Sequence, residues 1–389
     1  MRAHTCYYPL ADLNWARFPC MHWLTRLVFR ALCPMPAPFN ELRAAAEFHV
    51  NGYTLLPNVI PAALVKELSR KTDEYIQQRG PRLRNMATLG LGSKADNTAR
   101  SWILVDVQND EELRPLFTAC DREPRLRRML SLILRRPVRF LQRNEVVVNQ
   151  RLTWHRDALQ GELGAYTRHL PAFSEHDRHV HPIVAVGVFL ESHVNDSMGL
   201  VVKPGSHLSE RAEGYCPRRL MPTHAAAFLR DGATAKPPAA STGSQHIDAA
   251  MELACRRDGV VLPSGLGDAL LFDTRVQHRS GRDGWSVRVQ RMWEKQVKHR
   301  NRKLLTLSYG APSAFSDAHE RAVGMRNRLL TEKGLCNLTL GLPTRFGDAP
   351  VADRECVRRA VRDDLRRFNA SLRGATIWRG RGLPSPGLM

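Results

Sequence analysis

Two histidines and one aspartate in this chain have the types and the spacing of a metal site. His155 and Asp157 lie two residues apart, directly after Trp154. Side chains two residues apart in an extended strand point to the same face, so this pair could reach one ion. His278 follows a second apolar stretch and would supply a third ligand. Two histidines and one carboxylate form a facial triad, which leaves three positions of a non-haem Fe(II) ion open.

Each short motif alone is weak evidence, because a His-x-Asp triplet also arises by chance. A downstream arginine adds weight: Arg288 follows His278 within an expected strand over residues 285–293. A buried arginine beside a metal site needs an anionic partner, since an unpaired buried charge is costly. A dicarboxylate co-substrate would be that partner, held by the planar fork of the guanidinium group. The pattern as a whole therefore points to an oxygenase.

The elements that must position these residues are mostly short apolar strands bounded by glycine, proline and asparagine. Such strands without regular intervening helices favour a sandwich or jelly roll over a parallel sheet. The strands are expected over residues 138–148, 183–191, 199–202, 259–262, 268–272 and 286–296. Helical spacing of apolar residues predicts helices over residues 61–78, 111–134, 317–333 and 352–371.

Composition changes along the chain predict three parts. Residues 1–40 form a basic N-terminal extension, which could be a mitochondrial targeting segment, a surface helix or the product of a wrongly assigned start codon. Residues 41–311 form the catalytic domain, and an insertion over about residues 210–251 interrupts it. Residues 236–244 of that insertion are expected to be a disordered loop, with a lid over the substrate as the alternative. Residues 312–389 form a helical C-terminal extension.

Several phrases occur in an order that resembles the phytanoyl-CoA dioxygenase family of Fe(II)/2-oxoglutarate-dependent oxygenases. The resemblance extends from about Phe48 to about Ala311. It rests on the opening phrase at residues 48–61, the Trp-His-x-Asp at 154–157, the strand and Pro-Gly-Ser-His turn at 198–207, the Gly-Asp-Ala-Leu-Leu-Phe strand at 267–272, and the His-x-Ser-Gly at 278–281. Several phrases in the correct order are far more specific than one phrase alone.

The resemblance implies a fold, a set of cofactors and roles for individual residues. The fold would be a mainly β core with flanking helices, in the double-stranded β-helix (jelly-roll, cupin-like) arrangement. The cofactors would be Fe(II), 2-oxoglutarate as co-substrate and O2, with ascorbate as a candidate reductant. The iron ligands would be His155, Asp157 and His278, and Arg288 and Ser280 would bind the distal carboxylate of 2-oxoglutarate.

The chain departs from the family pattern at two positions. Arg288 lies one residue closer to the distal histidine than the family arginine does, and Arg291 would point to the opposite face of a regular strand. Met198 replaces an asparagine of the turn before Gly199, where the family residue has a structural role. The reaction implied is hydroxylation of a C–H bond in a small or acyl-CoA-like substrate, with release of succinate and CO2.

The charge leaves two other functions open. The formal net charge is +20 and the pI is about 10.3, which is typical of proteins that bind nucleic acid or other polyanions. Arginine far outnumbers lysine, a bias that a GC-rich genome also produces. The alternatives are a catalytically degenerate family member that acts as a basic binding protein, and an oxygenase that acts on nucleic acid or protein. Nucleic acid is compatible with the charge but is not the favoured partner.

The cysteines and the apolar runs bear on the cellular compartment of the protein. Eight cysteines are scattered without ligand-like spacing, so reduced thiols in an intracellular compartment, cytoplasmic or mitochondrial, are the simplest account. The longest apolar run near the core, residues 183–190, is too short to cross a bilayer, so no transmembrane segment is expected. His155-Arg156-Asp157 also begins like a kinase catalytic loop, but the residues that would have to follow it are absent.

Overall fold

The computed structural model describes residues 39–79, 102–148, 154–157, 166, 183–192, 199–208, 259–262, 264–280, 302–331 and 355–367. Contacts divide the chain into two units, Met1–Glu41 and Leu42–Met389, and apart from Glu41 the elements below lie in the second. The insertion over residues 210–251 and nearly all of the N-terminal extension lie outside the described residues, as do Arg288 and the expected strand at 286–296.

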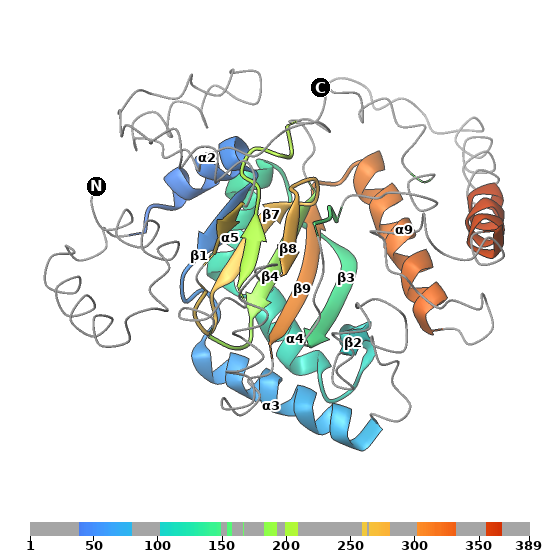
Figure 1. Cartoon of the computed structure of the whole chain (residues 1–389), viewed down its shortest axis with the longest axis horizontal. Coiled ribbons are helices and arrows are strands. Elements are labelled where there is room, and N and C mark those ends of the chain that lie inside the picture. Colours follow the sequence, from blue (N-terminus) through green and yellow to red (C-terminus); the bar gives the residue numbers. More distant parts are fainter. Residues whose placement is uncertain are drawn as a thin grey trace, which may run out of the picture. The chain divides into compact units, whose positions relative to one another are not determined.

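The core contains a six-stranded antiparallel sheet and a separate three-stranded antiparallel sheet (Figure 1). The larger sheet has the order β1 (Tyr53–Leu56), β7 (Ala269–Asp273), β4 (Val184–Phe189), β9 (Lys303–Gly310), β3 (Arg139–Val148) and β2 (Trp102–Val105). The smaller sheet has the order β6 (Val260–Val261), β5 (Leu200–Val202) and β8 (His278–Ser280). Every residue of β4 and β7 is buried, which explains why these strands are apolar without alternation.

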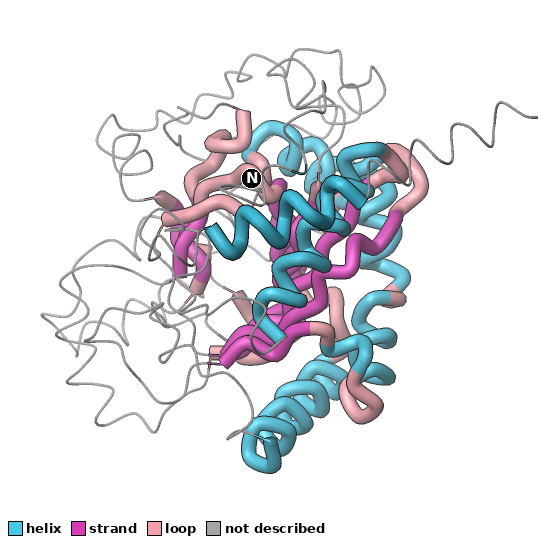
Figure 2. Tube along the Cα trace, turned by 90° about the vertical axis from the view of Figure 1, so that its right-hand side faces the viewer, coloured by secondary structure: helices cyan, strands magenta, loops and turns pink. Residues whose placement is uncertain are grey.

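Helices lie beside the strands, in differing directions (Figure 2). They are α2 (Glu41–Asn51), α3 (Ala62–Arg79), the short 3₁₀ helix η5 (Val107–Asn109), α4 (Arg114–Asp121), α5 (Pro124–Leu134), α9 (Ala314–Thr331) and a further helix over residues 355–367. Helix α5 shows how the sequence specifies one of them. Pro124 occupies its first turn, and the Glu123 side chain accepts a hydrogen bond from the Arg125 N–H. Its buried residues recur with helical spacing: Leu126, Met129, Leu130 and Ile133.

Buried polar contacts attach the helices to the larger sheet. The Lys303 ammonium of β9 is almost fully buried and donates to the Ser69 hydroxyl and the Asp73 carboxylate of α3, at 2.8 Å and 2.6 Å. The Arg326 guanidinium of α9 pairs with the buried Glu145 carboxylate of β3. Buried charges are tolerated only when they are paired in this way, so these contacts fix where each helix docks.

Most predicted elements are present, with some corrections. The predicted strands at 138–148, 183–191, 199–202, 259–262 and 268–272 correspond to β3, β4, β5, β6 and β7. The mostly helical character predicted for residues 111–134 is confirmed, and the chain divides there into α4 and α5 at Arg122–Glu123. Strand β9, which lies between β4 and β3, was not predicted at all. The antiparallel sheet core with flanking helices confirms the coarse fold class.

Two cysteines lie within the described residues. Cys120 is free and buried, and burial raises the pKa of its thiol to about 12. Cys356 is disulfide-bonded, so the expectation of reduced thiols does not hold for this residue. No helix in the described part of the chain has the length and apolar character needed to cross a membrane.

Candidate metal centre

His155 and His278 are brought together by main-chain pairing. The N–H of each residue donates to the carbonyl of the other at 2.9 Å, which forms an isolated antiparallel bridge beside β8. Side chains of two directly opposed residues stand next to each other on one face of such a pair. Asp157, two residues beyond His155, returns to that same face. The bridge thus unites two segments that are far apart in the sequence.

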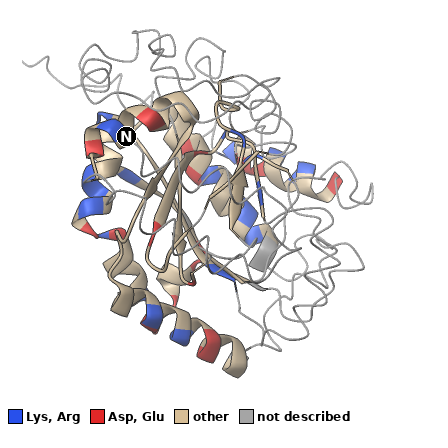
Figure 3. Cartoon of the chain, turned by 60° about the vertical axis from the view of Figure 1, so that its left-hand side comes forward, with Lys and Arg blue, Asp and Glu red and all other residues tan. Residues whose placement is uncertain are grey.

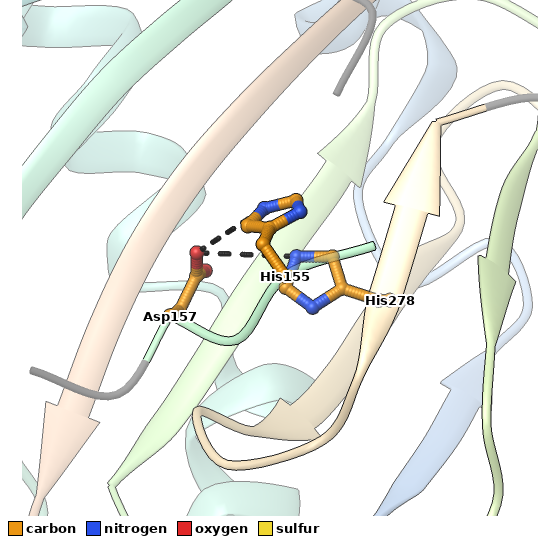
Figure 4. Close-up of side chains that lie close together, drawn as sticks. All are labelled: His155, Asp157 and His278. Atoms are coloured by element: carbon orange, nitrogen blue, oxygen red, sulfur yellow. Dashed lines mark ion pairs between the residues drawn. The ribbon is translucent and has the colours of Figure 1, made fainter. Parts of the chain in front are cut away.

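The three side chains converge on one point (Figure 4). One ligand atom from each of His155, Asp157 and His278 lies within 4.8 Å of the other two. The Asp157 Oδ1 atom is 3.7 Å from His155 Nε2 and 3.9 Å from His278 Nε2. Both distances exceed a hydrogen bond, and they suit donors that share a central ion. The side chains are 7%, 11% and 6% exposed, so the ligand atoms are largely shielded from solvent.

The hydrogen bonding of His278 fits metal binding. Its Nδ1 atom is 3.1 Å from the Val276 carbonyl, and since a carbonyl only accepts, Nδ1 must carry the proton. In the neutral ring, Nε2 then carries the lone pair, and this atom is 3.9 Å from Asp157 Oδ1. Metal-bound histidines commonly donate their other ring N–H to a carbonyl, which fixes the ring and its tautomer. This donor set of two imidazoles and one carboxylate, with a fixed tautomer, fits an Fe(II) ion.

Trp154 lies on the opposite face from the three candidate ligands. Two cations lie over its indole ring, with the Lys203 ammonium 4.8 Å and the Arg279 guanidinium 5.0 Å from the ring centroid. Gly259 packs so closely that an added Cβ would be 2.6 Å from the ring. The ring therefore packs the residue before His155 against residues of and next to the smaller sheet.

Three of the segments that resemble the family are connected to one another by hydrogen bonds next to the metal centre. The Gly205 N–H donates to the Asn51 carbonyl and the Asp273 N–H donates to the Gly52 carbonyl, both at 2.8 Å. His207 Nε2 lies 3.1 Å from the His49 carbonyl, so its ring bonds to main chain and attaches the turn to α2. The opening phrase, the Pro-Gly-Ser-His turn and the segment before His278 therefore form one hydrogen-bonded support.

A histidine in this support should make the stability of the protein depend on pH. Burial, together with nearby Arg135 and His207, lowers the pKa of His49 from 6.5 to about 4. The unfolded chain therefore takes up a proton between pH 6.5 and 4 that the folded chain does not. We expect the free energy of unfolding to fall as the pH falls through this window, by about 3 kcal/mol at most from this group.

Denaturant titrations of the metal-free protein at pH 7, 6, 5 and 4 would measure this effect. The His49→Gln variant removes the titrating ring and should show a shallower loss of stability over the same range. An equal slope in both proteins would mean that His49 does not titrate in this way. The metal-free form is required because protonation of metal ligands would add its own pH dependence.

Of the two residues expected to bind 2-oxoglutarate, Ser280 lies within the described residues and Arg288 does not. Ser280 ends β8, is partly exposed, and lies two residues beyond His278, so the strand directs both to the same face. Arg288 and Arg291 lie outside the described residues, as does the histidine-rich stretch at residues 169–181. The sequence did not identify Ser206, Arg156 or Gly52 as supports of the site, although all three lie within phrases that it singled out.

Comparisons with known proteins give one extended match. The family model described as phytanoyl-CoA dioxygenase matches residues 48–284, which is more than half of the chain and contains all three candidate ligands. The match ends before Arg288. A search of curated proteins finds no match.

Several solved structures match this chain at low identity and low TM-score. The epimerase SnoN in complex with Fe3+, alpha ketoglutarate and nogalamycin RO is 18% identical, with a TM-score of 0.42, over 71% of this chain and 89% of that one. AviO1 from Streptomyces viridochromogenes Tue57 is 16% identical, with a TM-score of 0.40, over 72% and 98%. The non-heme monooxygenase ThoJ in its Ni complex is 14% identical, with a TM-score of 0.37, over 69% and 77%. These TM-scores are too low to support a statement about this chain.

Proposed function

The chain belongs to the phytanoyl-CoA dioxygenase family, and we propose that it hydroxylates a C–H bond of a small or acyl-CoA-like substrate at a site built from His155, Asp157 and His278. Membership in this family makes it an Fe(II)/2-oxoglutarate-dependent oxygenase. The observation that carries the residue assignment is the convergence of these three side chains within 4.8 Å.

The residues of the chain have separate tasks in this proposal. A bound Fe(II) ion would supply the redox chemistry of C–H hydroxylation: O2 is the oxidant, 2-oxoglutarate is converted to succinate and CO2, and one oxygen atom of O2 enters succinate while the other enters the hydroxylated substrate. His155, Asp157 and His278 would hold the ion from one side and leave its other positions to co-substrate and O2. Their low exposure keeps bulk water away from the reacting centre. Ser280 and Arg288 would bind the distal carboxylate and so orient the co-substrate.

We also propose that the two sheets form the double-stranded β-helix of this family. The six-stranded and three-stranded antiparallel sheets supply the strands, and the His155–His278 bridge adds one more pairing to the smaller sheet. Strand β7 ends at Asp273 in the larger sheet and β8 begins at His278 in the smaller one, so the chain passes between sheets directly before a candidate ligand. An intracellular location, cytoplasmic or mitochondrial, belongs to the same proposal.

The distribution of charge supports a small substrate over a nucleic acid. On several of the described helices, basic residues lie near acidic ones (Figure 3). Arg70 pairs with Glu67 and Glu74, and Arg139 pairs with Asp317 and Glu320. Such pairing balances much of the local positive charge that would bind a phosphate backbone. A steep salt dependence of binding to nucleic acid would favour the macromolecular alternative instead.

Anaerobic titration with Fe(II) and 2-oxoglutarate tests the function directly. The complex of iron with bidentate 2-oxoglutarate has a weak visible charge-transfer band, which should appear in the wild-type protein and be absent from His155→Ala. A band in both proteins would mean that His155 is not a ligand and that the iron site lies elsewhere. No band in folded wild-type protein would instead favour the degenerate binding protein.

Substitution of two nearby arginines tests the assignment of the co-substrate carboxylate. We expect Arg288→Ala to raise the dissociation constant for 2-oxoglutarate at least about tenfold, because the carboxylate loses its charged partner. Arg291→Ala removes the same charge three residues away and should leave that constant within about twofold, since its side chain would point to the opposite face. The reverse result would assign the role to Arg291.

A further inference from the structure

We infer that Ser206 is a positioning residue that connects the two ligand-bearing segments of the proposed iron site. This inference rests on the proposed function. The Ser206 hydroxyl accepts a hydrogen bond from the Gln277 N–H at 2.8 Å, one residue before His278. The Ser206 carbonyl accepts a hydrogen bond from Arg156 Nη2 at 3.0 Å, and Arg156 lies between His155 and Asp157. One buried residue therefore contacts the immediate neighbours of all three candidate ligands.

The turn around Ser206 holds Gln277 from two sides. Ser206 Oγ accepts a hydrogen bond from the Gln277 N–H, and the Lys203 N–H donates to the Gln277 carbonyl at 2.8 Å. The Ser206 hydroxyl in turn donates to the Lys203 carbonyl at 2.6 Å. The next residue, His278, pairs with Val202 in the register of β5 with β8. The turn thus sets where β8 begins and how far His278 reaches along the sheet.

The chemistry of this position requires a hydroxyl group. Ser206 is fully buried, and its Oγ atom acts as donor and acceptor at once. Alanine would remove both bonds and leave the Gln277 N–H without its partner in a place that water does not reach. The bond from Arg156 would remain, since it goes to the Ser206 carbonyl. The substitution should therefore loosen the His278 segment relative to the segment of His155 and Asp157.

Iron affinity in the full-length protein is the first measurement. We expect Ser206→Ala to raise the dissociation constant for Fe(II) about 10- to 100-fold, the range found when partners that orient a metal ligand are lost. Ser316→Ala is the matched control: Ser316 is also a buried serine, and its hydroxyl donates to the Ala311 carbonyl at 2.5 Å at the start of α9. The control should bind Fe(II) as the wild type does.

Amide hydrogen exchange in the metal-free protein gives a second readout that needs no iron. Exchange at residues 277–280 should accelerate in Ser206→Ala and stay unchanged in Ser316→Ala. Where Ser206→Ala does not fold, Arg156→Met removes the bond to the Ser206 carbonyl and keeps the Ser206 hydroxyl, and the same two measurements apply. We expect it to weaken Fe(II) binding and to leave exchange at residues 277–280 less affected.

The outcomes separate the inference from the proposed function. Wild-type affinity for Fe(II) in a folded Ser206→Ala protein would overturn the positioning role. Equal losses of affinity in Ser206→Ala and Ser316→Ala would also overturn it, because both would then follow from lower stability alone. A wild-type protein that binds no Fe(II) would sink the proposed function itself. Unchanged exchange at residues 277–280 would show that Ser206 does not hold this segment, whether or not iron binds.

Discussion

Asp157→Asn is expected to weaken Fe(II) binding by more than about 100-fold and to abolish the charge-transfer band. Loss of a partner that only orients a ligand already costs about 10- to 100-fold, and this substitution removes a ligand itself. Asparagine keeps the size of the side chain but offers a neutral amide in place of a carboxylate. Two neutral imidazoles then remain to hold a divalent ion.

The geometry explains why the effect should be confined to metal binding. The Asp157 Oδ1 atom is 3.7 Å and 3.9 Å from the two histidine Nε2 atoms, which is too far for a hydrogen bond between these atoms. The His155–His278 pairing is made by main-chain atoms, which the substitution leaves in place. We therefore expect a folded metal-free protein with a denaturation midpoint close to that of the wild type.

Asp363→Asn provides the matched control for this prediction. Asp363 is partly exposed on the helix over residues 355–367, where it lies 3.6 Å from Arg366. The substitution makes the same chemical change and the same change in net charge. The measurements are the iron content after anaerobic loading and the visible spectrum. Asp363→Asn should match the wild type in both, and Asp157→Asn should match it in neither. Stoichiometric, tight Fe(II) binding by Asp157→Asn would remove Asp157 from the site.

The candidate ligands could be predicted because their spacing carries the information. Asp157 follows His155 by two residues, and strand periodicity alone places both on one face. The partner of that segment could not be predicted in the same way, since the bridge from His155 to His278 joins residues that lie far apart in the sequence. Only the order of several phrases indicated that His278 completes the set.

Strand β9 was not predicted, and it shows why part of the fold could not be derived from the sequence. Strand β9 lies between β4 and β3, and its burial alternates in its first half, where partly exposed Leu304 and Thr306 separate buried residues. It also begins with Lys303, a residue whose charge argues against a central strand. The contacts with Ser69 and Asp73 of α3 satisfy that charge, and they come from a distant segment. The sequence around Lys303 does not show that residues of a distant helix will pair with its charge.

Ser206 lies within a phrase that was recognised, yet its task was not apparent. The Pro-Gly-Ser-His turn could be predicted as a turn from Pro204 and Gly205. Its contacts with Gln277 and with Arg156 depend on how the smaller sheet places three separate segments together. A turn that looked purely structural thus supports both sides of the proposed site.

Gly52→Ala is expected to destabilise the protein by about 2–5 kcal/mol, a large part of the stability of a typical domain. Gly52 directly follows α2, with φ of +83°, and its N–H donates to the Phe48 carbonyl at 2.7 Å. This is the left-handed conformation that ends many helices with glycine, and an alanine there costs about 1–2 kcal/mol.

Crowding adds to the cost of the conformation. An added Cβ at Gly52 would lie 2.4 Å from Val276 Cγ2 and 2.5 Å from His207 Nδ1, distances that force the neighbours to move. Overpacking of this kind typically costs about 1–3 kcal/mol. Both neighbours adjoin the support of the metal centre, since His207 follows Ser206 and the Val276 carbonyl accepts the His278 Nδ1–H. Fe(II) affinity should therefore fall together with stability.

Gly324→Ala makes the same chemical change where the structure predicts the opposite sign. Gly324 lies within α9, and an added Cβ there would meet nothing within 4 Å. Alanine is the better helix former, so we expect a gain of about 1 kcal/mol. Urea denaturation of the two variants and the wild type measures both effects under one set of conditions. Equal shifts in the two variants would mean that neither the backbone conformation nor the packing at Gly52 has the importance assigned to it.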